Sequence, residues 1–290
     1  MLLAIDVGNT HTVVGLWDGS EWAAVWRRAT SAADTEDQLA VWLKTLFDMR
    51  CIPFAVEGMV CASVVPALNQ ALRHLGEKWL HVQPVFLESG TDWGLPIEYR
   101  PPTAVGADRI ANALAALAKW DPPIVVVDFG TATTFDAISV DGTYVGGAIL
   151  PGVQVSADAL FSRAAKLPPV EFRAPDRAIG QTTVDSLQSG IMHGYAGAVD
   201  ALADRIGGEL SEAASGRPCR VVATGGLGKV FFGLCRSLEA YEPNLTLDGL
   251  VIAFRRHDGS TSTNPRWTRF CGRSARADAR LDSRSSSHQD

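Results

Sequence analysis

The sequence predicts an α/β protein that contains one kind of domain twice, each with a mixed β-sheet flanked by helices. The first observation is a short apolar run that ends in Asp6 and is followed by a Gly-Asn-Thr turn and a second apolar run. The second is that this pattern recurs about half a chain later, where the run 124–127 ends in Asp128 and continues as Asp-x-Gly-x-x-Thr. The third is that strand-like and helix-like runs follow one another along both halves. Two copies of one pattern indicate an internal duplication.

Composition and charge exclude several classes of protein. A chain of 290 residues, nearly half of them apolar, is long enough for two globular domains. The net charge of −6 argues against a nucleic-acid binder, and no apolar run approaches the length of a membrane span. No signal peptide is expected, because Asp6 interrupts the first apolar run and no basic residues precede it. Five scattered cysteines without a C-x-x-C motif favour reduced thiols in the cytoplasm over a zinc site.

Residues 1–17 predict a β-hairpin whose turn could hold a phosphate group. Gly8 lets the backbone approach a ligand closely, and Asn9 and Thr10 add side-chain donors to the backbone N–H groups of the turn. Asp6, at the end of the first strand, could hold a hydrated Mg²⁺ beside such an anion. An ordinary hairpin, in which these polar residues only stabilise the turn, explains this stretch equally well.

The chain then continues as strand, helix, strand and helix. Thr35 is expected to cap the first helix, because Gln38 three residues later completes a capping box. The expected bounds are 21–27 and 58–65 for the strands and 39–47 and 67–78 for the helices.

An alanine-rich helix is predicted over 110–118, and Asp108 and Arg109 lie at its start. Pro101 and Pro102 impose an extended approach to this helix. A helix N-terminus favours anions, so the pair could belong to a binding site. For an isolated Asp-Arg pair, however, the better explanation is an aspartate that complements the helix dipole and a solvated arginine.

The second half repeats the strand and turn and then adds a third glycine cluster. The two turns could face each other and hold the phosphates of a nucleotide from both sides, with the third cluster at the adenosine end. The expected elements are strands at 134–140, 142–152 and 220–223, helices at 153–165 and 188–205, and the cluster at 224–228.

Glycines recur along the predicted helix 188–205, at Gly190, Gly194 and Gly197. Small residues on one face allow close helix packing, which makes this helix a candidate subunit interface. Tight packing on the helix's own sheet is the alternative.

The character of the sequence changes after Phe254. Residues 255–290 carry eight arginines and four aspartates, a net charge of +4, so the rest of the chain carries −10. With little apolar periodicity, this segment predicts a disordered basic tail. Such a tail could contact an acidic partner, but solvated disorder is the simpler expectation.

Four motifs in this order resemble the type III pantothenate kinases of bacteria. They are Asp-Val-Gly-Asn-Thr at Asp6, Pro-Pro-x-x-x-Gly-x-Asp-Arg ending at Arg109, Asp-Phe-Gly-Thr-Ala-Thr at Asp128, and Gly-Gly-x-Ile-x-Pro-Gly ending at Gly152. Each motif is weak alone, but the combination is specific, and it covers roughly residues 2–254. That family belongs to the actin-like superfamily of acetate and sugar kinases. The resemblance therefore implies two ribonuclease-H-like domains, at 1–118 and 119–254, followed by the tail at 255–290.

The resemblance also implies an activity, the ATP-dependent phosphorylation of pantothenate to 4′-phosphopantothenate, the first step toward coenzyme A. It assigns Mg²⁺ to Asp6, a monovalent cation (K⁺ or NH₄⁺) to Asp128, and the role of general base to Asp108. The residues implied for ATP are Asp6, Val7, Gly8, Asn9, Thr10, His11, Thr12, Val13 and Thr131. Those implied for pantothenate are Tyr99, Gly106, Ala107, Asp108, Arg109 and Thr183. The family also implies a homodimer with the pantothenate pocket near the subunit interface.

Two alternatives remain at this point. A kinase of the same superfamily could act on another small hydroxylated substrate, although the Asp108–Arg109 motif disfavours this. A non-catalytic regulator could use the same fold, since accessory factors for virulence-gene expression share the motifs. The presence of Asp6, Asp108 and Asp128 favours an enzyme.

Overall fold

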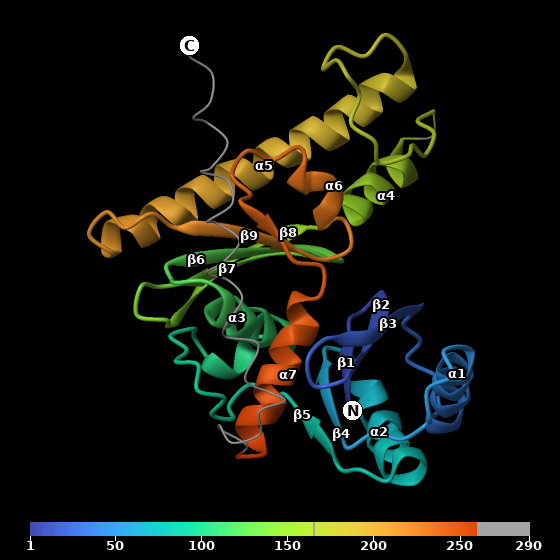
Figure 1. The fold of residues 1–290 in the computed structure, drawn as a ribbon. Helices are drawn as coiled ribbons and strands as arrows, with labels where there is room; N and C mark the ends of the chain where they lie inside the picture. Colours follow the sequence, from blue (N-terminus) through green and yellow to red (C-terminus); the bar gives the residue numbers. More distant parts are fainter. Residues whose placement is uncertain (165, 260–290) are drawn as a thin grey trace, which may run out of the picture.

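The computed structural model of the chain describes residues 1–164 and 166–259, and in this part of the chain two five-stranded mixed sheets face each other across a pair of helices (Figure 1). The strands of the first sheet are β1 (Leu2–Val7), β2 (His11–Trp17), β3 (Trp22–Ala29), β4 (Gly58–Ser63) and β5 (Pro84–Phe86). Those of the second sheet are β6 (Ile124–Phe129), β7 (Ala132–Ile138), β8 (Tyr144–Pro151), β9 (Arg220–Thr224) and β10 (Ala240–Tyr241).

The two sheets share one topology, β3-β2-β1-β4-β5 in the first and β8-β7-β6-β9-β10 in the second. In each, the leading strand pairs antiparallel with the next strand and parallel with a strand that follows a helical connection. Asp6 and Asp128 occupy the same place, one residue before the end of β1 and of β6. The duplication that the repeated motif predicts is therefore present in the backbone.

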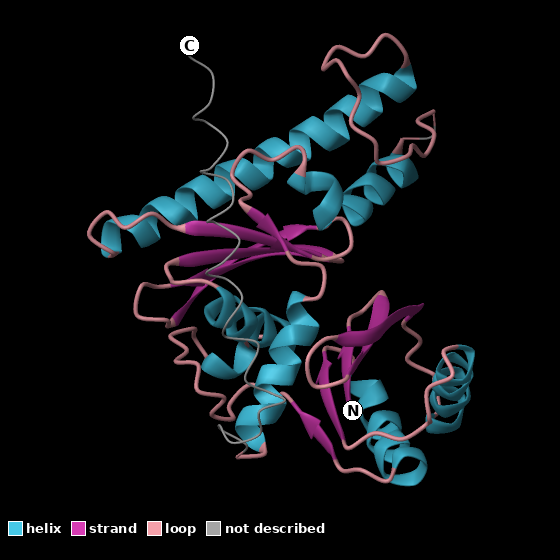
Figure 2. Cartoon of the chain, viewed as in Figure 1, coloured by secondary structure: helices cyan, strands magenta, loops and turns pink. Residues whose placement is uncertain are grey.

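Each sheet has its own outer helices, and two helices lie between the sheets (Figure 2). The outer helices are α1 (Glu36–Met49) and α2 (Pro66–His74) on the first sheet, and α4 (Val153–Arg163), α5 (Thr183–Ala213) and α6 (Gly228–Phe232) on the second. The inner helices are α3 (Ala107–Lys119) and α7 (Leu245–His257).

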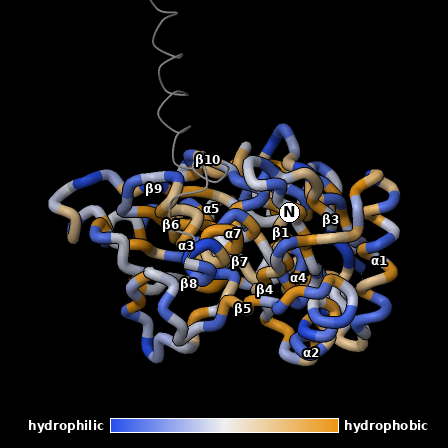
Figure 3. The backbone as a smooth tube through the Cα atoms, turned by 60° about the horizontal axis from the view of Figure 1, so that its bottom comes forward, coloured by the Kyte–Doolittle hydropathy of each residue, from blue (hydrophilic) through white to orange (hydrophobic). Residues whose placement is uncertain are grey.

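The inner helices pack directly on each other. A Cβ atom on Gly249 would lie 1.9 Å from the carbonyl oxygen of Ala111, so this crossing of α7 over α3 requires a glycine. One hydrophobic core joins both inner helices to both sheets, whereas the outer helices cover separate cores. Hydrophobic residues gather accordingly in the middle of the molecule (Figure 3). No helix within the described ranges is long and apolar enough to span a bilayer.

Most predicted elements are present, with changed ends. The capping box of α1 forms as predicted, with both hydrogen bonds between Thr35 and Gln38. The second predicted helix ends as α2 and continues as a π-helical turn, Leu75–Leu80. α5 is longer than the predicted 188–205, because Thr182 caps it and its glycines do not interrupt it. α7 was not anticipated.

The predicted tail starts too early. α7 continues through His257, and Nη1 of Arg256 donates to the carbonyl oxygen of Trp93, so the last turn of this helix is anchored to the body. Residues 260–290, which make up the remainder of the predicted tail, lie outside the described residues. The domain limit at 118 stays a prediction, and α7 carries the body of the protein past the predicted limit at 254.

Candidate active site

The two repeated turns meet at the centre of the molecule. The first turn (residues 7–11) closes with a hydrogen bond from Gly8 N to His11 O of 3.0 Å. The second turn (residues 129–132) is one residue shorter and closes with a hydrogen bond from Gly130 N to Ala132 O at 3.1 Å. The structure thus brings together the two turns that the sequence predicts to face each other, through a hydrogen bond between Thr10 and Thr131.

The first turn is held by Thr30, the residue that follows β3. The hydroxyl of Thr30 donates to the carbonyl oxygen of Gly8 at 2.7 Å, and its backbone N–H donates to the carbonyl oxygen of Thr10 at 2.9 Å. Both turn carbonyls therefore point back into the protein. Asn9 and Thr10 are exposed, as a contact with a ligand requires.

Three of the residues implied for ATP can contribute only their backbone. The side chains of Val7 and Val13 pack in the hydrophobic cores, and the buried Thr12 hydroxyl lies 2.9 Å from that of Thr30. His11 is largely exposed, and the partial burial of its ring and the nearby Arg27 guanidinium both lower its pKa.

Three carboxylates converge beside the two turns. Burial raises the pKa of Asp6 well above its ordinary value, and the charges of Asp108 and Asp128 raise it further. Burial raises the pKa of Asp128 to about 7, against the hydrogen bond from Asn112, and Asp108 adds to this increase. The pKa of Asp108 is also raised by burial. Each carboxylate is therefore hard to ionise unless a cation is nearby.

These carboxylates suit a hard cation. In the described part of the chain, no group of three or more His, Cys, Asp or Glu residues could hold a metal by itself. Mg²⁺, however, is usually bound through one or two carboxylates together with substrate phosphates and water. Asp6 and Asp128 supply such oxygen ligands at the ends of two strands, and a cation there would relieve their mutual repulsion.

Two residues that the sequence did not single out orient Asp128. Nδ2 of Asn112 donates to Oδ2 of Asp128 at 3.0 Å, and the hydroxyl of Thr246 donates to Oδ1 of Asn112 at 2.8 Å. Asn112 is completely buried. Its position four residues after Asp108, on the same face of an alanine-rich helix, was a signal that could have identified it.

Asp108 has a structural role as well as a place in the site. Its Oδ1 accepts a hydrogen bond from the N–H of Arg109 at 2.8 Å, in the first turn of α3. A Cβ atom on Gly106 would lie 2.5 Å from this oxygen, so the glycine makes room for the carboxylate. This contact agrees with the simpler explanation from sequence, an aspartate that only complements the helix dipole, and that explanation and the catalytic role both stay predictions.

Arg109 is not a solvated charge, and this alternative is wrong. It is 7% exposed, and its Nε donates to Oδ1 of Asp136 at 2.6 Å. The hydroxyl of Tyr144 donates to the same oxygen at 2.9 Å. Burial raises the pKa of Asp136 to about 6, while Arg109 and Tyr144 oppose this increase.

Tyr99 completes this side of the site. Its ring lies 6.4 Å from that of Tyr144 in an edge-to-face arrangement, and a Cβ atom on Gly146 would contact it at 3.7 Å. Four of the six residues implied for pantothenate, Gly106, Asp108, Arg109 and Tyr99, therefore surround one region, and Ala107 is part of the same helix start. Asp136 and Tyr144 were not predicted from the sequence. An aspartate within an otherwise apolar strand was a signal that could have identified Asp136.

Thr183 does not join them. It is exposed at the first position of α5, at the end of that helix that lies away from α3 (Figure 1). No described hydrogen bond links it to Asp108 or Arg109.

The third glycine cluster lies against the second turn. Gly225 adopts a φ of +88°, and a Cβ atom there would lie 2.5 Å from Oδ1 of Asp128. Gly226 faces Arg27 on β3, where a Cβ atom would lie 2.8 Å from Nη2. The loop after β9 therefore reaches both sheets.

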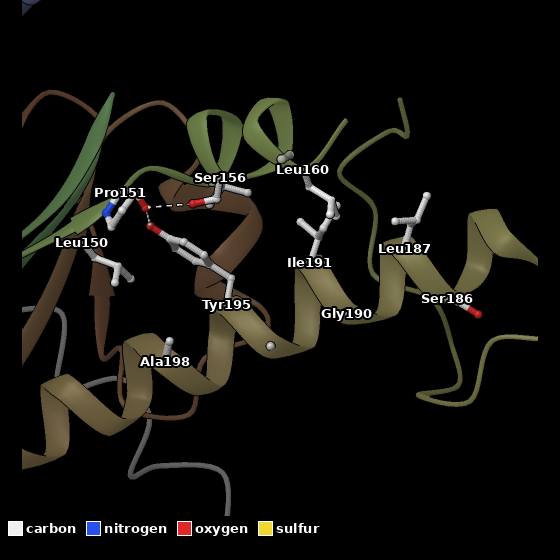
Figure 4. Close-up of a pocket in the computed structure, with 13 residues that line it drawn as sticks. Leu150, Pro151, Ser156, Leu160, Ser186, Leu187, Gly190, Ile191, Tyr195 and Ala198 are labelled. Carbon is white, nitrogen blue, oxygen red and sulfur yellow. Dashed lines mark hydrogen bonds between the residues drawn. The ribbon is translucent and has the colours of Figure 1, made fainter. Parts of the chain in front are cut away.

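An apolar cavity of about 640 Å³ opens between α4 and α5 (Figure 4). Gly190 and Gly194 line it, together with Ile191 and Leu160. A Cβ atom on Gly190, Gly194 or Gly197 would meet nothing within 4 Å. Packing of these glycines on the helix's own sheet, the alternative left by the sequence, is therefore wrong, and their face of α5 is open.

Comparisons with known proteins agree on one family. The model of the type III pantothenate kinase family matches residues 2–205. A type III pantothenate kinase from Myxococcus xanthus (strain DK1622) is 44% identical over 261 residues, which cover 90% of this chain and 100% of that protein.

Two solved structures show the same fold. A protein from Campylobacter jejuni described as a Baf family transcriptional activator has a TM-score of 0.58 at 20% identity. The match covers 89% of this chain and 99% of that protein. A protein from Sinorhizobium meliloti described as a 2-dehydro-3-deoxygalactonokinase has a TM-score of 0.56 at 14% identity. The match covers 91% of this chain and 99% of that protein. At these identities the likeness concerns the fold alone. It confirms the predicted fold class of two duplicated α/β domains. From the sequence matches, the chain belongs to the type III pantothenate kinase family.

Proposed function

We propose that this chain transfers the terminal phosphoryl group of ATP to the primary hydroxyl of pantothenate, with Asp108 as the general base. Family membership makes the chain a pantothenate kinase, and the proposal concerns how its residues divide the work. The observation that carries it is the meeting of Asp108 with two further carboxylates beside two facing turns. Phosphoryl transfer needs this combination of phosphate donors, cations and one carboxylate at the hydroxyl.

The nucleotide is held by both turns. Asn9, Thr10 and Thr131 contribute donors, while Val7, Thr12 and Val13 contribute only their backbone. Support comes from the exposed hydroxyls of Thr10 and Thr131, which lie side by side where phosphate oxygens would have to enter. Contact with both turns would orient the terminal phosphate toward Asp108.

Cations balance the charge of the site. Mg²⁺ at Asp6 would neutralise the phosphates during transfer, and a monovalent cation at Asp128 would compensate a carboxylate whose pKa burial raises to about 7. Asn112 and Thr246 keep the Asp128 side chain in one orientation. Asp108 can then accept the proton of the pantothenate hydroxyl while its backbone hydrogen bond holds it in place.

The working unit in this proposal is a homodimer in the cytoplasm. Thr183 begins α5 at the end that lies away from α3 (Figure 1), and the open glycine face and cavity of α5 leave room for a second copy. Exposed apolar side chains belong to this surface, such as Leu160, which is 40% exposed and lines the cavity. We therefore propose that α5 forms the subunit contact and that Thr183 completes the pocket of the partner.

Replacing Gly194 by Glu tests the dimer, because the side chain would fill the cavity with a charge. Sedimentation should show a dimer for the unchanged protein and a monomer for the variant. Gly208→Glu is the control, since Gly208 lies on the same helix, away from the cavity, with equally open space. A dimeric Gly194→Glu variant would contradict the proposed contact.

Pantothenate-dependent release of ADP, measured in a coupled assay, tests the function itself. We expect release with pantothenate and ATP, and a lower rate without K⁺ or NH₄⁺. Activity only with a different hydroxylated substrate would favour the other-kinase alternative, and binding of ATP without turnover would favour the regulator.

A further inference from the structure

We propose that Arg27 binds the β- or γ-phosphate of ATP, from β3 and across the space between the two sheets. This inference rests on the proposed function, because it concerns the same nucleotide. Nothing in the repeated motifs points to this residue. Its evidence is its position in the first sheet, its contact with the second, and the charge around it.

The strand register places Arg27 on the inner face of the first sheet. Asp6 is paired with Val13 across β1 and β2, and Val13 is paired with Arg27 across β2 and β3. Directly paired residues project to the same face of a sheet. The Val13 side chain packs against the core between the sheets, so Arg27 projects to the side on which the second sheet lies.

Arg27 also touches the second sheet. A Cβ atom on Gly226 would lie 2.8 Å from Nη2 and 3.1 Å from Nη1 of Arg27, so the loop after β9 runs against the guanidinium. Burial raises the pKa of Tyr241, at the end of β10, and Arg27 opposes this increase. The arginine therefore lies where the two halves of the molecule approach each other.

The charges around Arg27 favour a role for its guanidinium in binding an anion. Asp6, Asp108 and Asp128 place three carboxylates at the site, and Arg27 opposes the increase that burial and the other two cause in the pKa of Asp6. Repulsion by these carboxylates disfavours a nucleoside triphosphate unless cations balance them. The exposed guanidinium of Arg27 makes no hydrogen bond or ion pair with another described residue, so its donors are available.

The chemistry of arginine fits a phosphate. Its planar guanidinium offers five N–H donors in a geometry that matches phosphate oxygens. Mg²⁺ bridges β- and γ-phosphate oxygens in nucleotide-dependent phosphoryl transfer. Asp6 is the proposed Mg²⁺ ligand, and Arg27 lies on the same face two strands away, close enough for its charge to lower the pKa of Asp6, so these are the phosphates that we expect it to bind.

Arg28 provides a matched control on the same strand. It has the same charge, but its guanidinium pairs with Asp34 at 2.8 Å and lies over the ring of Trp42 on the outer face. Arg27→Gln and Arg28→Gln therefore remove the same group from opposite faces of one sheet. Arg27 is exposed, so its replacement should leave the melting temperature nearly unchanged.

The experiment measures binding of the nonhydrolysable ATP analogue AMPPNP with Mg²⁺, and of AMP, to the full-length protein and both variants by calorimetry. For Arg27→Gln we expect an AMPPNP affinity about 10- to 100-fold lower, the usual effect of a charge-assisted hydrogen bond. AMP, which lacks the β- and γ-phosphates, should bind the variant and the unchanged protein equally. Arg28→Gln should bind AMPPNP within about twofold of the unchanged protein.

Three results would overturn the proposal. They are an unchanged AMPPNP affinity in Arg27→Gln, an equal loss for AMP, or an equal loss in Arg28→Gln. Unchanged protein that binds AMPPNP but releases no ADP with pantothenate would contradict the proposed function and leave the Arg27 result standing. Unchanged protein that does not bind AMPPNP would contradict both.

Discussion

The hydroxyl oxygens of Thr10 and Thr131 lie 2.7 Å apart, although the two residues belong to different sheets and are 121 positions apart in the sequence. This hydrogen bond joins the two turns at their exposed surfaces. A phosphate that contacts both hydroxyls must compete with it or share it.

Replacing Thr131 by Val should weaken ATP binding without unfolding the protein. The hydroxyl is exposed, so we expect a change in unfolding free energy within about 0.5 kcal/mol. Loss of one neutral donor should raise the KM for ATP by roughly two- to tenfold and leave the KM for pantothenate unchanged. Thr131→Ser keeps the hydroxyl and should behave like the unchanged protein. Equal KM values for ATP in both variants would remove Thr131 from the nucleotide site.

Asp108→Asn should abolish most catalysis while the protein still folds. Asparagine keeps an oxygen that can accept the hydrogen bond from Arg109 N, but it cannot take a proton. We expect kcat to fall by about 10²–10⁴-fold, the usual contribution of a general base, with pantothenate still bound. A purely structural aspartate would instead cost about 0.3–1 kcal/mol of stability and spare kcat. Measuring kcat together with the melting temperature separates these roles.

Turnover should depend on a monovalent cation through Asp128. Burial raises the pKa of this carboxyl to about 7, so without a counter-charge much of it is protonated at neutral pH. Replacing K⁺ by tetramethylammonium should sharply reduce kcat. Asp128→Ala should have low activity that no longer responds to K⁺. The same rate for the unchanged protein in K⁺, Na⁺ and tetramethylammonium salts would contradict this cation site.

Asp136→Asn should impair recognition of pantothenate through Arg109. The carboxylate fixes the guanidinium by the 2.6 Å contact, so its loss should release Arg109 and raise the KM for pantothenate about tenfold or more. The KM for ATP should not change. Asp248→Asn is a close control, because Asp248 is also a buried aspartate with a cationic partner. It pairs with Lys119 at 2.7 Å and accepts a hydrogen bond from Trp22 at 2.8 Å, and neither partner is one of the residues implied for pantothenate. If both variants raise the pantothenate KM equally, Asp136 has only a structural role.

The same aspartate gives a pH dependence of stability. Its pKa of about 6 in the folded protein is above the ordinary value of 3.8, so the folded state holds this proton more tightly than the unfolded state. The stability due to Asp136 is therefore fully present below about pH 4 and is lost as the pH rises through about 6. Melting curves in that range should show this decline for the unchanged protein and a smaller one for Asp136→Asn. A decline of the same size in both proteins would contradict the raised pKa.

Local patterns made much of the site predictable. Asp6 and Asp128 end apolar strands and precede glycine turns, and this strand-and-turn pattern depends only on neighbouring residues. The capping box of α1 is local for the same reason. Such features require no knowledge of which strands pair.

The partners of these residues were not predictable in the same way. Thr246 orients Asn112 from 134 positions away, and Arg27 meets Gly226 only because the two sheets face each other. α7 was not predicted because its start has no side-chain cap and its last turn carries arginines that were assigned to the tail. These contacts depend on how distant elements pack, which the sequence pattern does not encode locally.

The position of α7 at the end of the described chain has a consequence for protein synthesis. Residues 245–257 are translated after both sheets, yet they fill the space between the sheets and supply Thr246 to the site. A nascent chain that ends before α7 has only α3 to cover the inner faces of the sheets and lacks the residue that orients Asn112. Ribosome-bound chains of this protein therefore assemble the complete candidate site only after α7 has been synthesised.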